Sequence, residues 1–291
     1  MLSVIIGISS ALIYGAADFL GGTASRRISP VRVTAVAAAA GLVALLITLP
    51  FVGGAWSTEA VLLGALSGVT GAVAIGLLYA CLAIGPMSIL SPLTAVVSAI
   101  VPLTIGLVGG ERLQPIDYLA LGLALVAVVL VGFVPEKGAV RPSLRGVLMA
   151  VGSGAAIGLF LVIIDQTPDD SGLVPLVVNR AVGAALLFAV VGLLALRRSS
   201  RSQSDRIETP AAAWLPGLRL AILCGIVDAV ANTGLLIGLR LGELSVMAVL
   251  TALYPAGTII LAAVVLKERI APVQIVGLVL AVAAGAMLAL A

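Results

Sequence analysis

The chain of 291 residues is 62% hydrophobic and only 10% charged, whereas soluble domains carry roughly 25% charged residues. Water-facing helices of this composition would expose apolar patches well above what a soluble monomer tolerates, which excludes a soluble fold. The formal net charge is only +3, and the few aromatic residues are not interleaved with Lys or Arg, which excludes a nucleic-acid-binding surface.

The two cysteines stand apart, and the chain has no histidine. Cys81 and Cys224 lie in separate apolar runs without the spacing of a zinc or redox motif. We therefore expect no metal site and no resident cofactor, although coupling to a proton or another ion stays open. The chain also has no GxxxxGK[ST] loop, so we expect no ATP hydrolysis.

The first apolar run, Leu2 to Gly22, is followed rather than preceded by basic residues, namely Arg26, Arg27 and Arg32. A cleavable signal peptide has the reverse order of charge, so this run predicts a retained first membrane span.

Ten apolar segments of membrane-crossing length follow one another between clusters of Pro, Gly and charge. They are residues 2–22, 31–53, 59–84, 87–109, 115–134, 144–166, 172–196, 213–239, 244–266 and 271–290. The sequence thus predicts an all-α, polytopic membrane protein of ten transmembrane helices, with the lipid bilayer as its surroundings.

Basic residues gather in the loops on one side of the predicted membrane. The loops after the odd-numbered spans hold Arg26, Arg27, Arg32, Lys137, Arg141, Arg145, Arg197, Arg198, Arg201, Arg206, Arg219, Lys267 and Arg269. The opposite loops hold only Arg112 and Arg240. The positive-inside rule predicts a bacterial-type inner (plasma) membrane protein with both termini outside.

An internal repeat relates spans three to five to spans eight to ten. A shift of 157 residues superimposes polar and special residues that composition alone would not align. The pairs are Gly85 with Gly242, Ser88 with Ser245, Thr94 with Thr251, Glu111-Arg112 with Glu268-Arg269, and Pro115 with Pro272. Each unit has an odd number of spans, so the second enters the membrane upside down. We predict two inverted five-helix repeats, residues 1–137 and 143–291, an organisation suited to alternating access; duplication that merely builds a stable bundle is the alternative.

Several short motifs resemble the EamA family of the drug/metabolite transporter superfamily. They are Tyr14-Gly15, Gly110-Glu111-Arg112-Leu113, Leu253-Tyr254-Pro255 and Lys267-Glu268-Arg269-Ile270. The resemblance spans almost the whole chain as two tandem copies, except that the first copy has Ser98 where the second has Pro255. It implies export or exchange of small metabolites, amino acids, sugars or drugs, driven by an ion gradient or by exchange.

The best candidates for a substrate or coupling site are charged residues inside the spans. Asp228 lies near the middle of span eight, where an ionised side chain costs about 2.5–3.5 kcal/mol. Arg180 is the only basic residue well inside a span. We expect the two to meet in a central cavity with Asn179 and Asn232 beside them, and to bind the polar end of a substrate or exchange a proton. A buried pair that only fixes helix packing is the alternative.

Further candidates are Asp18, one turn from Tyr14 in the first span, and two tyrosines within later spans, Tyr79 and Tyr254. Asp18 is a candidate coupling site, or an interfacial residue solvated by water. The tyrosines line a cavity in the functional interpretation and pack between helices in the alternative. Pro255 predicts a helix break, a feature often found beside transporter binding sites.

Three classes of function compete. A secondary transporter of small molecules, able to work as a monomer, accounts for the inverted repeat, the helix break and the sparse buried polar groups. An intramembrane enzyme would require a catalytic cluster, and no His ligands, GxSxG element or paired intramembrane aspartates are present. A membrane assembly or signalling subunit would normally add a soluble domain. The sequence therefore predicts a transporter and not an enzyme.

Overall fold

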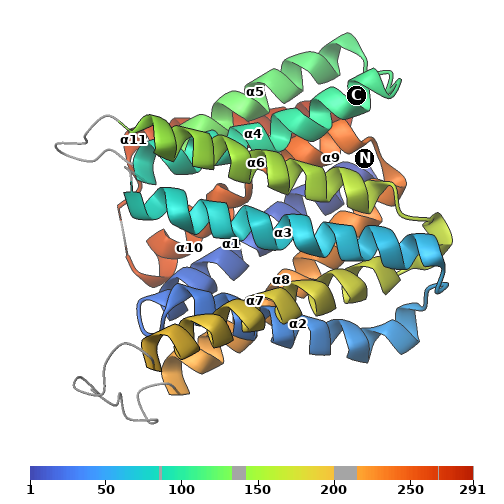
Figure 1. Ribbon diagram of the computed structural model, residues 1–291. Helices are drawn as coiled ribbons and strands as arrows, with labels where there is room; N and C mark the ends of the chain where they lie inside the picture. Colours follow the sequence, from blue (N-terminus) through green and yellow to red (C-terminus); the bar gives the residue numbers. More distant parts are fainter. Residues whose placement is uncertain (85–86, 133–141, 200–214, 268, 291) are drawn as a thin grey trace.

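The computed structural model describes residues 1–84, 87–132, 142–199, 215–267 and 269–290, and all regular structure in these ranges is helical (Figure 1). The helices are α1 (Leu2–Ser25), α2 (Pro30–Val52), α3 (Thr58–Ile84), α4 (Met87–Val108), α5 (Pro115–Gly132), α6 (Leu144–Asp165), α7 (Val174–Ser199), α8 (Leu215–Leu241), α9 (Leu244–Thr251), α10 (Tyr254–Val265) and α11 (Pro272–Leu290), with a 3₁₀ turn η1 (Asp169–Ser171) before α7.

Most of these helices are long and apolar enough to cross a bilayer. Within the described residues nine stretches meet that criterion, one of them formed by α9 and α10 together. Helix α4, 22 residues long and apolar, supplies the tenth. The prediction of a multi-pass, all-α membrane protein is confirmed, and both termini lie at the same end of the bundle (Figure 1).

The turns that start α5 and α11 are built alike. Both helices begin at a proline, whose missing N–H is not needed in the first turn. The Gln114 N–H donates to Asp117 Oδ2 at 2.8 Å, and the Ala271 N–H donates to Gln274 Oε1 at 3.0 Å. The same reciprocal cap therefore closes the corresponding turn in each repeat.

The ninth span is interrupted, whereas its counterpart in the first repeat is continuous. Helix α9 ends at Thr251, and α10 starts at Tyr254 with Pro255 in its first turn. Helix α4 runs unbroken through Ser98 at the position of Pro255. The proline lacks an N–H to continue the helix and restricts the residue before it, so the break occurs only in the second copy.

Helix packing follows the pattern of two related halves. Helix α1 packs on α8 and α10, as α6 packs on α3 and α4; likewise α2 packs on α8, as α7 packs on α3. Three further pairs join a helix to its own counterpart, α2 with α7, α4 with α9, and α5 with α11. Contacts between equivalent elements are what a twofold axis between two inverted repeats produces.

Glycines at equivalent points allow the closest of these contacts. A Cβ atom at Gly68 would lie 2.6 Å from the Asn179 carbonyl oxygen, and one at Gly225 would overlap the Ala37 carbonyl oxygen. Gly225 is 157 residues beyond Gly68, and Asn179 is 142 beyond Ala37. The same small-residue approach therefore joins α3 to α7 and α8 to α2.

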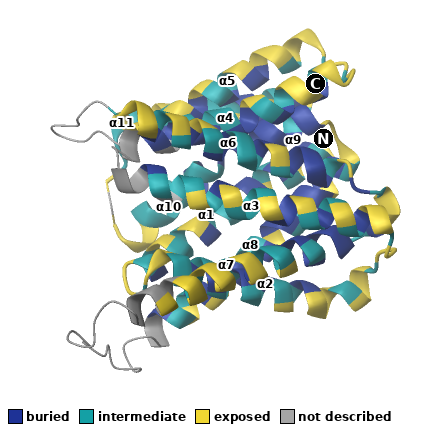
Figure 2. Cartoon of the chain, in the orientation of Figure 1, coloured by how far each residue is buried: buried dark blue, intermediate teal, exposed yellow. Residues whose placement is uncertain are grey.

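Packing is tighter at the end of the bundle that holds the termini (Figure 2). Helix α10 has no buried residue after Gly257, and the described part of α7 has none after Ala184. Several large side chains that are fully buried, among them Met247 and Leu250 of α9, lie toward the end with the termini. We call this end the terminal end and the other the basic end, after Arg26, Arg27, Arg32, Arg145, Arg219, Lys267 and Arg269.

Candidate functional site

The centre of the candidate site is an ion pair between α7 and α8. The Arg180 Nη2 donates to Asp228 Oδ2, and their side chains are only 19% and 25% exposed. One turn along α8, Asn232 Nδ2 donates to the Asp228 carbonyl oxygen at 2.8 Å and to Oδ2 at 3.3 Å. Both charges are thus compensated away from bulk water, as a charged group inside a membrane span requires.

Asn179 lies elsewhere and corrects the expectation that it sits beside this pair. Its Nδ2 donates to Ser67 Oγ of α3 at 2.9 Å, and the contact is buried. Successive residues of a helix diverge by about 100°, so Arg180 and Asn179 face different neighbours. Asn179 therefore ties α7 to α3, and its contacts are those of a packing residue.

One face of α1 passes from tight packing to open space. A Cβ atom at Gly7 would lie 2.9 Å from Leu250, and Ala11 is 2% exposed. Next along the face come Tyr14, which is half-buried, and Asp18, which is exposed. A Cβ atom at Gly22, on the following turn, would meet nothing within 4 Å.

This face of α1 points between α8 and α10 and not toward lipid. On one side of it, a Cβ atom at Gly21 would lie 3.2 Å from Cys224 Sγ of α8. On its other side, Gly15 packs against Gly257, and Thr258 Oγ1 of α10 donates to the Gly15 carbonyl oxygen at 3.1 Å. The exposure of Asp18 therefore marks a space between helices that is reached from the basic end.

Asp18 and Tyr14 belong to the same electrostatic environment as the ion pair. Tyr14 lies within electrostatic reach of Asp228, Arg180 and Asp18, and Asp18 within reach of Asp228. Within the part of the chain that the structure describes, Asp18 has neither a hydrogen bond nor an ion pair. The structure thus gathers Asp228, Arg180, Asn232, Tyr14 and Asp18 around one region.

Tyr254 approaches this region from the interrupted ninth span. It is half-buried at the start of α10, within electrostatic reach of Asp18, and its carbonyl oxygen lies against Gly15. The break before Pro255 therefore stands next to α1 at the level of Tyr14. Tyr79 belongs to α3, but its side chain lies outside the described residues.

The terminal end is closed by a helix cap that joins the two repeats. The Ser245 N–H, in the first turn of α9, donates to Glu111 Oε2 at 3.2 Å, and Ser245 Oγ donates to the Leu103 carbonyl oxygen at 3.2 Å. The carboxylate thereby compensates the helix N-terminus. Partial burial and the adjacent Glu111 carboxyl raise the pKa of Glu243, which precedes α9.

A second closure at this end is made by Arg240 at the end of α8. Its guanidinium donates to the Thr167 Oγ1 at 2.6 Å and to the Thr167 and Pro168 carbonyl oxygens at 2.5 and 3.0 Å, and pairs with Asp169 at 3.1 Å. Arg240 therefore holds α8 against the turn after α6.

Sequence reasoning missed these two closures. From the sequence, Glu111 is identified only as part of the repeated Glu-Arg motif, and Arg240 only as a basic loop residue. The repeat offered a signal for Glu111. Glu111 and Ser245 each have an identical residue at the equivalent position of the other copy, Glu268 and Ser88. For Arg240, which replaces Ala83 of the first repeat, we find no equivalent signal.

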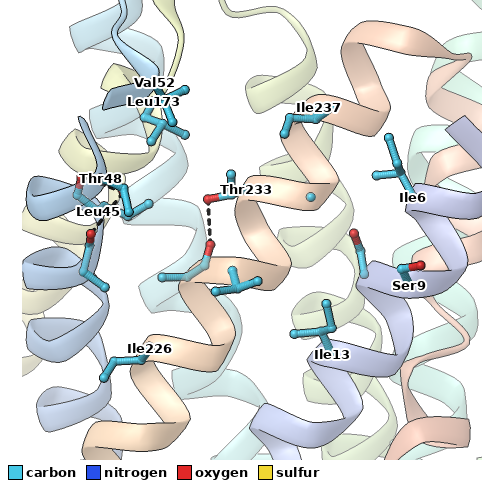
Figure 3. A pocket seen from close by; sticks show the side chains of 15 residues that line it. Ile6, Ser9, Ile13, Leu45, Thr48, Val52, Leu173, Ile226, Thr233 and Ile237 are labelled. Atoms are coloured by element: carbon cyan, nitrogen blue, oxygen red, sulfur yellow. Dashed lines mark hydrogen bonds between the residues drawn. The ribbon is translucent and has the colours of Figure 1, made fainter. Parts of the chain in front are cut away.

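An apolar hollow lies on the opposite face of α8 from Asp228. It is a cavity of about 430 Å³ between α1, α2 and α8, lined by aliphatic side chains such as Ile13, Ile226 and Ile237 (Figure 3). Its Thr233 and Thr48 hydroxyls donate to carbonyl oxygens of their own helices at 2.8 and 3.0 Å. Both threonine hydroxyls are thus satisfied within their own helices, and many lining residues are exposed, so the hollow has the character of a lipid-facing groove.

These features define a multi-pass membrane protein with two repeats and charged residues in its interior, the architecture of a transporter. Residues 1–133 and 144–290 each match the EamA-like transporter family, so the chain belongs to that family. One solved structure, titled "Crystal structure of protein", is 18% identical with a TM-score of 0.73 and covers 99% of this chain and 98% of that chain. At this identity the likeness establishes the fold. No curated protein matches the chain.

Proposed function

We propose that the chain is a secondary transporter of small solutes that works by alternating access, with the Asp228–Arg180 pair as the core of its site. The observation that carries this proposal is the gradient along α1, from Gly7 packed on α9 to Asp18 in open space. A site reached from one end and closed at the other is the arrangement expected of one state in an alternating cycle.

The two closures at the terminal end support the same proposal. The Glu111–Ser245 contact joins the first repeat to the start of a helix of the second, and the Arg240–Thr167 contact holds the end of α8 against the turn after α6. Each contact is made by a small number of groups at the end of a helix. It can therefore break without unfolding that helix. Their release would open the terminal end as the basic end closes.

The charge of the two ends supports the predicted orientation in the inner membrane. Among the described residues the basic end carries nine Lys or Arg residues, whereas the terminal end carries only Arg112 and Arg240. By the positive-inside rule the basic end faces the cytoplasm. We expect a membrane-impermeant maleimide to label Glu59→Cys, but not Arg27→Cys, in intact cells of a chain with Cys81 and Cys224 replaced by Ser. The reverse labelling would overturn this orientation.

The transport proposal is tested by replacing Asp228 with Asn. This variant keeps the size of the side chain and removes the charge that Arg180 compensates. In cells that produce the chain, we expect untargeted metabolite profiling to show solutes whose distribution changes, and the change to vanish in Asp228→Asn at an equal membrane level. Glu59→Gln, an exposed carboxylate at the start of α3, is the matched control and should retain the change.

Identical metabolite profiles for the parent chain and Asp228→Asn, with Asp228→Asn present in the membrane, would contradict the proposed site. They would leave the pair in the role of a packing element and favour the alternatives of an assembly subunit or an intramembrane enzyme. A profile lost equally in Glu59→Gln would indicate a general loss of folding.

A further inference from the structure

We propose that the site selects organic monocations, with Asp18 as the carboxylate that binds their charged nitrogen or phosphorus. This inference rests on the proposed transport function and names its substrate class. It starts from the charge balance: Arg180 compensates Asp228, and Asp18 has no partner within the described part of the chain. When Asp18 is ionised, the three charges sum to −1.

The Asp18 carboxylate faces open space between membrane helices, and no fixed cation within the described residues compensates it. Asn232 does not relieve Asp18, since its amide donates to Asp228. An arriving cation would restore neutrality to the group of three charges. An anion would meet two carboxylates, and its natural partner, the Arg180 guanidinium, is already bound to one of them.

The same balance disfavours zwitterions relative to cations. A zwitterion brings a carboxylate that needs a donor of its own, whereas the guanidinium is held by Asp228 and the neighbouring asparagine is engaged. Binding it would require the pair to break, which leaves a buried charge exposed to apolar surroundings. A monocation needs no such rearrangement.

The surroundings of Asp18 suit a cation with an aromatic or bulky apolar body. Tyr14 lies one turn away on the same face of α1, and Tyr254 is within electrostatic reach. Aromatic rings attract cations through their faces and offer apolar contact to the rest of the molecule. The space that continues beyond Gly22 gives access from the basic end.

The test measures binding of a matched series by isothermal titration calorimetry to the purified full-length chain. Phenethylamine is the cation, phenylalanine the zwitterion, 3-phenylpropionate the anion and 2-phenylethanol the neutral probe, with tetraphenylphosphonium as a bulkier cation. We expect at least one of the two cations to bind about tenfold more tightly than the other classes, a difference of about 1.4 kcal/mol.

Three variants assign this preference to its residue. Asp18→Asn should lose at least about tenfold in cation affinity, Asp18→Glu should retain the preference because it keeps the charge, and Glu59→Gln should bind as the parent chain does. Each variant is first checked for a thermal unfolding transition like that of the parent.

Three results would overturn the inference. They are equal or tighter binding of the zwitterion or anion, cation affinity unchanged in Asp18→Asn, and no binding of either cation to the folded chain. If Asp228→Asn abolishes the metabolite change while Asp18→Asn leaves cation affinity intact, transport stands and only the substrate class fails. If Asp228→Asn has no effect on the profile, the proposed transport site itself fails.

Discussion

The polar region on α1, α7 and α8 can be compared with its counterpart on α6, α2 and α3. Gly15, which packs on α10, and Gly158, which packs on α4, align Asp18 with Leu161. The Gly68 and Gly225 contacts align Arg180 with Ala38, and the shift of 157 residues aligns Asp228 with Gly71. The helices pack alike in both regions, but the three charged residues of one are apolar in the other. Duplication thus preserved the contacts that build the bundle and left the charged site in one copy only.

The two regions also differ in how far they are open. Leu161 is 6% exposed, although Asp18 at the equivalent position of α1 is exposed to the space at the basic end. In an alternating-access cycle the two repeats adopt different conformations and exchange them. In any one state, equivalent positions of the two repeats are therefore exposed to different extents. The two repeats therefore share a helical scaffold, but only one of them carries the charged site.

The largest effect is expected from a substitution that breaks the ion pair of the charged site. Arg180→Ala leaves Asp228 without its cation, and we expect a loss of about 3 kcal/mol in the free energy of unfolding, measured by denaturation of the purified protein in detergent. Arg180→Ala combined with Asp228→Ala should be less damaging than Arg180→Ala alone, because the unpaired charge is gone. Arg219→Ala, an exposed arginine at the basic end, is the control and should shift stability by less than about 0.5 kcal/mol. Equal losses in the free energy of unfolding for Arg180→Ala and Arg219→Ala would contradict the special role of the ion pair.

An intermediate effect tests the shared scaffold. Gly68→Ala and Gly225→Ala each force a Cβ atom against a carbonyl oxygen of the adjacent helix, and we expect both to cost about 1–3 kcal/mol. Gly71→Ala meets nothing within 4 Å and should be neutral or gain up to about 1 kcal/mol from helix propensity. Thermal unfolding of the three purified variants provides the measurement. A loss in only one of the two close contacts would break the equivalence of the repeats.

The smallest effect concerns the closed terminal end. The pKa of Glu243 is raised in the folded protein, so folding favours its protonated form. Its contribution to stability is present below the ordinary glutamate pKa of about 4.3 and is lost as pH rises through the folded value. Glu243→Gln mimics the protonated form, so its unfolding temperature should fall less than that of the parent between pH 4 and pH 7. The difference should be small because Glu243 is exposed, and a steeper fall in the variant would contradict the sign.

Much of the fold could be predicted because each helix must satisfy its backbone within lipid. The apolar runs therefore gave ten spans whose limits lie close to the observed helices, and the break before Pro255 follows from proline chemistry. The meeting of Arg180 with Asp228 was also predictable, since a lone charge within each of two successive spans needs a partner. Asn179 could not be placed this way, because hydrogen-bonding capacity does not reveal which neighbouring helix a residue faces.

The sequence by itself determined the environment of this protein, the number of its spans and the presence of a repeat, because hydropathy and register are properties of the chain alone. Only the tertiary structure decided that Asp18 faces open space between α8 and α10, that Glu111 caps α9, and that Arg240 holds the turn after α6. These contacts join residues far apart in the chain, and their geometry depends on how the helices pack. The imbalance of charge around Asp18 became visible only once the partners of Arg180 were known.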